Sequence, residues 1–306
     1  MSRHLRFIPE EGTLVEITCR TIQGRFLLRP GPALDDILLG VLGRAQRLYP
    51  VEICAFSFLS NHYHLLLWVQ DAERMTRFMW YFQTNAAREV ARLANWPDKV
   101  WSRRYEAIVI SNEPAAQVDR LRYVLAQGVK EGLVGRVADW PGATMVRALM
   151  EDRPLRGTWF NRTREYAARL TRKPLDPRSY AEEETVTLSQ LPCLRDLSPQ
   201  AYRNVVAGLV QEIESEAAAE RALTGCEPLG AGAILRQHPH TRPNRTEKSP
   251  APRFHAASRR VRQELREAYG WFLVAFREAA ESLKAGDRLA RFPDGCFPPG
   301  LPFVRV

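Results

Sequence analysis

The sequence has no long apolar segment and few cysteines. Its most apolar stretch is residues 65–69, whereas a membrane-spanning helix needs about 20 apolar residues. The first residues lack the apolar core of a signal peptide. The five cysteines are scattered and form no Cys-x-x-Cys pair, so neither a disulfide framework nor a zinc knuckle is supported. We therefore expect a soluble protein of the cytoplasm with no membrane partner.

Charge is the one skewed quantity in the composition. Hydrophobic residues make up 45% and charged residues 26%, which is typical of a globular protein, and 306 residues allow two domains or one domain with long additions. Lysine and arginine total 44 against 35 acidic residues, a net charge of +9. A basic excess of this size points to a polyanionic partner, with nucleic acid first.

Most of this excess lies in residues 236–262, which contain eight basic residues and one acid, a net of +7. The first part of this stretch, residues 236–256, is rich in proline and predicts a basic, extended linker. A solvated tether is the alternative. Because a tether would not need so many arginines, we favour contact with phosphate. The candidate DNA-binding residues here are Arg242, Arg245, Arg259 and Arg260.

Alternating strand-like and helix-like patterns precede the linker. Strands are expected at residues 13–21, 51–60, 62–70 and 105–111, and helices at residues 32–48, 74–94 and 113–133. Two adjacent strands between helices predict an α+β fold: a ferredoxin-like (RRM-like) antiparallel sheet with helices on one face, not a doubly wound parallel sheet. A mostly helical C-terminal extension follows. The expected units are residues 1–140, an accessory helical region 141–235, the linker 236–256, and a helix and tail 257–306.

Two histidines lie two residues apart on the third expected strand. Alternate residues of a strand point to the same face, so His62 and His64 project together while Tyr63 points to the opposite, apolar face. Two adjacent imidazoles are well placed to hold one metal ion. The alternative is a solvent-facing pair on an edge strand. A second pair, His238 and His240, lies in the proline-rich linker, where no strand would hold it, and we do not expect a metal there.

The third expected helix carries a tyrosine and a glutamine on one face. Tyr123 and Gln127 are four residues apart, and Lys130 follows on the same side. An amphipathic helix with a boundary tyrosine is the plainer interpretation. Together with the histidine pair, however, the set supplies a nucleophile in Tyr123, a cation for phosphate in Lys130, and three candidate metal ligands, His62, His64 and Gln127.

These segments resemble a known family. NHYHLLLW at residues 61–68 resembles the His-hydrophobic-His (HUH) motif of single-tyrosine transposases, and YVLAQGVKEGLV at residues 123–134 resembles their nucleophile helix. VWSRRYEAIV and VEITCR resemble further segments of the REP-associated tyrosine transposases and the related small insertion-sequence enzymes. The resemblance covers roughly residues 10–140. Gln127-Gly128 replaces the frequent Asn-Pro, and Ser60 and Glu106 also depart from the family pattern.

The resemblance implies that residues 1–140 form a catalytic domain in which Tyr123 attacks single-stranded DNA beside a hairpin, as in a REP-like repeat or an insertion-sequence end. A 5′-phosphotyrosine would form and a DNA 3′-hydroxyl would later reverse it, giving strand transfer and transposition. It also implies a bacterial, nucleoid-associated monomer or homodimer. Because tyrosine has a pKa of about 10, it needs help as a nucleophile, and Mg²⁺ or Mn²⁺ on neutral ligands would polarise the phosphate.

Three basic side chains near these motifs are further candidate DNA contacts, namely Arg103, Arg104 and Lys130. Trp101 is more consistent with core packing than with base stacking. Three alternative functions stay open: a non-catalytic ferredoxin-like nucleic-acid-binding protein, a relaxase-type nuclease, and a domesticated HUH nuclease that no longer transposes. The histidine pair with Tyr-x-x-x-Gln favours an enzyme over a binding module, because a binder has no use for that set.

Overall fold

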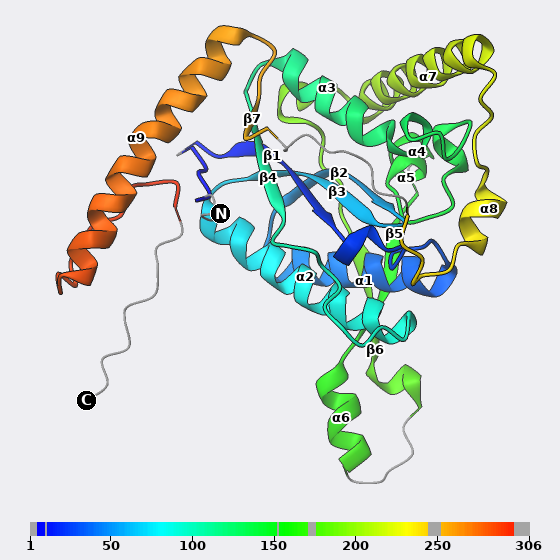
Figure 1. The fold of residues 1–306 in the computed structure, drawn as a ribbon, viewed down its shortest axis with the longest axis horizontal. Coiled ribbons are helices and arrows are strands. Elements are labelled where there is room, and N and C mark those ends of the chain that lie inside the picture. Colours follow the sequence, from blue (N-terminus) through cyan, green and yellow to red (C-terminus); the bar gives the residue numbers. More distant parts are fainter. Residues whose placement is uncertain (1–4, 10, 152, 171–175, 244–251, 297–306) are drawn as a thin grey trace.

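A five-stranded sheet with strand order β2-β3-β1-β4-β7 forms the centre of the computed structural model (Figure 1). The structure describes residues 5–9, 11–151, 153–170, 176–243 and 252–296. The strands of this sheet are β1 (Thr13–Arg20), β2 (Glu52–Leu59), β3 (His62–Val69), β4 (Glu106–Ile110) and β7 (Phe254–His255). Neighbours among the first four strands are antiparallel, whereas β7 joins the edge parallel to β4.

Helices cover both faces of this sheet, whereas we expected helices on one face only. On one side lie α1 (Pro32–Leu48) and α2 (Ala72–Leu93), and on the other α3 (Pro114–Leu125) contacts β2 and β3 (Figure 1). The reason is that the second face also carries apolar residues such as Leu59 and Leu66, which would otherwise be exposed to water.

The helix predicted at residues 113–133 is interrupted. It forms α3 and then a short helix, α4 (Gln127–Lys130), with Ala126 between them. The side-chain Nε2 of Gln127 donates to the carbonyl of Tyr123 at 2.9 Å. In a continuous helix that carbonyl accepts the backbone N–H of residue 127, so the side chain competes with the regular bond.

A β-hairpin arm interrupts the region 141–235, which was expected to be helical. Its strands β5 (Leu155–Phe160) and β6 (Ala181–Val186) pair antiparallel and flank α6 (Arg162–Leu170). Two glycines let the arm approach α1: a Cβ at Gly40 would lie 2.2 Å from the carbonyl carbon of Thr158, and one at Gly157 would lie 2.2 Å from the carbonyl oxygen of Asp36. Main chain therefore packs directly on main chain at this junction.

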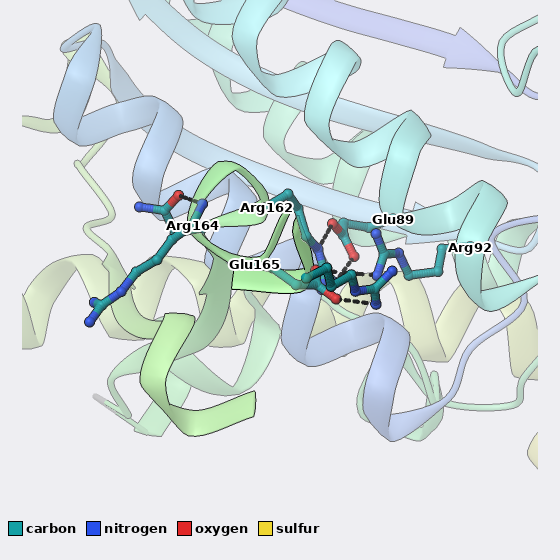
Figure 2. A network of polar contacts seen from close by, with 7 residues as sticks. Glu89, Arg92, Arg162, Arg164 and Glu165 are labelled. Atoms are coloured by element: carbon teal, nitrogen blue, oxygen red, sulfur yellow. Dashed lines mark hydrogen bonds and ion pairs between the residues drawn. The ribbon is translucent and has the colours of Figure 1, made fainter. Parts of the chain in front are cut away.

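A buried ion-pair network also fixes the arm to α2 (Figure 2). Arg162 donates to Glu89 of α2 at 2.7 Å and to Glu165 of α6 at 2.8 Å, and both carboxylates are buried. Burial alone would raise the pKa of Glu165, but hydrogen bonds and charge from Arg162, with Arg92 and Arg169, hold it below its ordinary value. The network therefore keeps the carboxylate of Glu165 ionised.

The C-terminal half is mostly helical, as predicted, and includes α5 (Val146–Glu151), α7 (Pro199–Thr224), α8 (Ala231–Arg236) and α9 (Arg259–Lys284). Short 3-10 turns occur at Ile22–Gly24, Val137–Asp139, Pro177–Tyr180 and Pro192–Leu194. Ser198 caps α7, and the apolar side of this helix is buried, namely Tyr202, Val206, Leu209, Val210 and Ile213. Among the described residues, no helix is both long and apolar enough to cross a membrane.

The described parts of the expected linker contact the core. Ser60 donates to Gln237 at 2.9 Å, and His240 Nε2 donates to the carbonyl of Ala94 at 2.7 Å. This ring nitrogen of His240 is therefore used in packing against the segment that follows α2. Farther along, β7 extends the sheet. These parts of residues 236–256 are therefore docked, which differs from the free extended chain that we expected.

Candidate active site

The two histidines of β3 project from the same face of the sheet, toward α3. Tyr63, between them, points the other way and accepts a hydrogen bond from Gln83 of α2 at 2.9 Å. The rings of His62 and His64 lie edge to face with centroids 5.1 Å apart. The alternation predicted from the sequence is therefore confirmed, and the pair is not on an edge strand, because β3 lies between β2 and β1.

Tyr123 of α3 lies next to this pair. Its ring centroid is 5.5 Å from that of His64, and Lys130 Nζ is 4.5 Å from the centre of the Tyr123 ring. Gln127 is buried and reaches Tyr123 through the amide bond described above, which leaves its Oε1 as a possible ligand. The candidate nucleophile Tyr123 predicted from the sequence therefore lies near His64, Lys130 and Gln127, and His62 lies next to His64.

A buried carboxylate that the sequence analysis missed orients His64. Glu16 of β1 accepts from His64 Nδ1 at 2.8 Å through one oxygen and from Arg120 of α3 at 2.9 Å through the other. Burial would raise the pKa of Glu16, but the hydrogen bond and charge of His64, together with Arg120, hold it below its ordinary value. An ionised Glu16 fixes the proton of His64 on Nδ1.

In the neutral tautomer that this hydrogen bond selects, His64 Nε2 carries the lone pair, and in the structure this atom is buried without a hydrogen-bond partner among the described residues. A buried polar atom of this kind is costly unless something binds it. A carboxylate on one imidazole nitrogen with a cation on the other is the usual arrangement of metal-binding histidines. His62 is held in a similar way, with Nδ1 2.7 Å from Asn61 Oδ1.

The donor set fits a divalent cation with neutral ligands. Within the described residues, no three side chains of the His, Cys, Asp and Glu types are grouped as a metal site. Two imidazoles and one amide oxygen, from His62, His64 and Gln127, would leave most of the cation's charge available to a phosphate.

The hydroxyl of Tyr123 is not activated by its protein surroundings alone. Burial and the negative charge of Glu16 raise the pKa of Tyr123, while the side chains of Gln127 and Arg120 oppose this. The guanidinium of Arg120 lies 4.9 Å from the centre of the tyrosine ring. At neutral pH the phenol therefore keeps its proton, and attack on a phosphate needs a further positive charge.

The network continues beyond Arg120 to the C-terminal strand. Arg120 donates to His255 Nδ1 of β7 at 3.1 Å, and His255 Nε2 lies 3.0 Å from Asp119 Oδ2. Burial and the nearby charge of Arg120 lower the pKa of His255, although Asp119 opposes this, so the ring is neutral and accepts from Arg120. A residue far along the chain thus holds Arg120 against Glu16.

The other predicted DNA contacts lie on the surface. Arg103 and Arg104 are exposed, and Arg103 pairs with Glu106 at 3.3 Å. Arg242, Arg259 and Arg260 are exposed as well, and Arg245 lies outside the described residues. Trp101 is half-buried and donates to the carbonyl of Gln83 at 3.0 Å, in agreement with core packing.

Glu16 had a visible signal in the sequence that we did not use. It is a charged residue in the middle of the apolar strand pattern at residues 13–21, and a buried charge of this kind is rare unless it is paired. Arg120 and His255 had no comparable signal, because only the folded chain brings helix α3 and strand β7 to β1.

Comparison with known proteins gives a limited likeness. No protein-family model matches the sequence, and no curated protein matches it. A solved REP-associated tyrosine transposase bound to a REP hairpin is 21% identical, with a TM-score of 0.37, over 47% of this chain and 82% of that one. A putative transposase from Deinococcus radiodurans R1 is 17% identical, with a TM-score of 0.28, over 40% of this chain and 95% of that one. The first is of the family whose motifs the sequence resembles, but at these TM-scores neither likeness assigns a function.

Proposed function

We propose that the protein is a metal-dependent, single-tyrosine HUH endonuclease and strand transferase, a transposase that acts on single-stranded DNA beside a hairpin. One observation carries the proposal: the unpartnered, buried Nε2 of His64, oriented by Glu16, lies in the same site as Tyr123. The antiparallel strand order β2-β3-β1-β4, with α1 and α2 as connections, supports a ferredoxin-like catalytic domain.

His62, His64 and Gln127 would hold Mg²⁺ or Mn²⁺, which when bound polarises a phosphate oxygen and offsets negative charge. The oxygen of Tyr123 attacks the phosphorus, a tyrosine–phosphorus bond forms, and the bond from phosphorus to the DNA 3′-oxygen breaks. The phenol loses one proton and the departing 3′-oxygen gains one, so no net proton is consumed. Lys130 Nζ and the Arg120 guanidinium, 4.5 Å and 4.9 Å from the centre of the Tyr123 ring, would stabilise the negative charge of the phosphate.

The reverse step needs no other group. The covalent link keeps the energy of the phosphodiester, so a second DNA 3′-hydroxyl attacks the phosphotyrosine and releases Tyr123. Strand transfer therefore requires no nucleotide cofactor. The oligomeric state, monomer or homodimer, stays a prediction. So does the mobilisation of DNA by this protein.

The test is a covalent-adduct assay with full-length protein, Mn²⁺ and labelled single-stranded DNA that carries a hairpin. The solved neighbour with a REP hairpin suggests the probe, namely REP-like hairpins from the DNA flanking this gene. Wild-type protein should give an adduct on a denaturing gel, and Tyr123→Phe should abolish it. Tyr105→Phe is the matched control, because burial raises the pKa of Tyr105 to about 12 and its hydroxyl is buried.

An undiminished adduct with Tyr123→Phe would overturn the assignment of the nucleophile. DNA binding by the wild-type protein without any adduct, across several hairpins and with Mn²⁺ or Mg²⁺, would instead favour the non-catalytic nucleic-acid-binding alternative.

A further inference from the structure

A second candidate binding surface lies between β7 and α9, at the edge of the sheet (Figure 1). Residues 252–255 form one wall of a groove of about 670 Å³, and α9 forms the other. We call it the β7–α9 groove. Its lining includes Arg253 and His255 on the strand side and Arg262, Arg266 and Gly270 on the helix side.

The helix wall of the groove is positively charged, and acidic side chains of the protein neutralise little of this charge. Arg262 and Arg266 are four residues apart on one side of α9, while Glu264, on another side, pairs with Arg260 at 2.5 Å. In the described part of the chain, no carboxylate forms an ion pair with Arg262 or Arg266, and Arg262 donates only to the carbonyl of Ala256, at 2.9 Å. Guanidinium groups so placed are suited to binding phosphate.

Gly270 keeps this wall open. Glycine inside a helix is less stable than alanine, so a packing or functional reason is expected where it occurs. At Gly270 an added Cβ would meet no heavy atom within 4 Å. Packing within the chain therefore does not require glycine here, whereas a ligand that approaches the helix backbone would.

The groove is linked to the candidate active site through two side chains, His255 and Arg120. His255 lines the groove, accepts from Arg120 at 3.1 Å, and Arg120 in turn lies 4.9 Å from the centre of the Tyr123 ring. Arg120 and His255 therefore connect the site at Tyr123 with the β7 wall of the groove.

We propose that the β7–α9 groove binds the phosphate backbone of the single-stranded DNA that continues from the cleavage position. The inference rests on the proposed function for the identity of the ligand. It differs from the sequence prediction, which selected Arg259 and Arg260, because the residues that line the groove are Arg262 and Arg266.

The test is equilibrium binding of full-length protein, without added metal, to three labelled DNAs: a hairpin alone, the same hairpin with a single-stranded extension, and an unstructured oligothymidylate. We expect Arg262→Ala/Arg266→Ala to weaken binding of the extended and unstructured probes about tenfold. If both arginines contact phosphate, the slope of log affinity against log salt should become shallower by about 1.4. Arg288→Ala/Arg291→Ala, at two exposed arginines that follow α9, removes the same charge and should change affinity less than twofold.

A second pair of variants addresses the shape of the groove. Gly270→Glu should weaken binding of the extended probe, whereas Gly208→Glu, at a helical glycine of α7 that also has no heavy atom within 4 Å of an added Cβ, should not. Thermal melting confirms that each variant is folded.

Equal effects of the groove and control variants would overturn the proposal. A loss confined to the hairpin-alone probe would also overturn it, because the contact would then be to the stem. Since none of these measurements needs cleavage, a wild-type protein that forms no adduct but shows the expected binding differences would refute the proposed function while leaving the groove assignment intact.

Discussion

Replacement of Glu16 by glutamine gives the sharpest test of how the histidine face, the side of the sheet that carries His62 and His64, is organised. The substitution keeps the size of the side chain and removes its charge. In the folded chain Glu16 accepts one hydrogen bond from His64 and one from Arg120, and its side chain is 1% exposed. A glutamine offers one acceptor oxygen, so its amide NH₂ must face one of these two donors.

Two effects of different size follow. The side chain of Arg120 is 12% exposed, and its charge loses the buried partner that compensates it, which typically costs about 3–5 kcal/mol. The bond from Arg120 to His255 remains, so we expect the lower end of this range. Separately, loss of the group that orients a metal-binding histidine usually lowers metal affinity about 10–100-fold.

Urea unfolding measures the first effect and Mn²⁺ titration calorimetry the second. The double variant Glu16→Gln/Arg120→Gln separates them, since it leaves no unpaired buried charge. We expect it to recover part of the unfolding free energy while Mn²⁺ binding stays weak. Glu106→Gln is the matched control, because among the described residues Glu106 forms its ion pair with the exposed Arg103, and His64 pairs with Glu16 instead. Its expected effect on stability is below about 1 kcal/mol.

Mn²⁺ affinity equal to that of the wild type in folded Glu16→Gln protein would refute this reasoning, because His64 would then bind metal without Glu16 or would not bind it at all. An equal loss in Glu106→Gln would show that the effect is one of general charge and not of orientation.

Two further predictions concern stability. Gly40→Ala should lower the free energy of unfolding in urea by about 1–3 kcal/mol, because the new Cβ would lie 2.2 Å from the main chain of Thr158. The control Gly208→Ala should raise this free energy by up to about 1 kcal/mol. Similar values for the two variants would contradict the close packing of the arm on α1. Burial raises the pKa of Asp35 to about 6, whereas an aspartate in the unfolded chain has a pKa of about 4. Between these two pH values the folded state binds more protons than the unfolded state, so the folded protein loses stability as the pH rises from about 4 to about 6. In urea unfolding, the stability of Asp35→Asn relative to the wild type should therefore increase as the pH rises from pH 4.5 to pH 7. A difference in unfolding free energy between the two proteins that does not change with pH would disprove the raised pKa of Asp35.

Local patterns predicted much of the fold. The period of apolar residues placed α1 at Pro32–Leu48, as observed, and the alternation along β3 gave the opposite directions of Tyr63 and His64. Both are properties of short segments, because a strand or helix repeats every two or 3.6 residues whatever its surroundings. The spacing of Tyr123 and Gln127 succeeded for the same reason, even though the helix is interrupted between them.

Long-range pairing could not be predicted in this way. The strands β5 and β6 are separated by α6, so no tight turn marks the hairpin, and its packing on Gly40 depends on tertiary structure. The interruption of the helix at Ala126 arises from one competing side-chain hydrogen bond, which periodicity does not detect.

The orientation of His64 shows why charge counts alone do not identify such a site. The net charge of +9 led only to the expectation of a polyanionic partner, whereas the groups that orient His64 form a line of alternating partners: Asp119, His255, Arg120 and Glu16. Each group in the line forms a hydrogen bond or an ion pair with the next, so their positions are coupled. Since His255 lies outside residues 1–140, the chemistry of the histidine face depends on a strand from the C-terminal part of the chain. The same residue also lines the β7–α9 groove, so occupation of that groove by a phosphate would act on Arg120, and through it on Glu16 and His64.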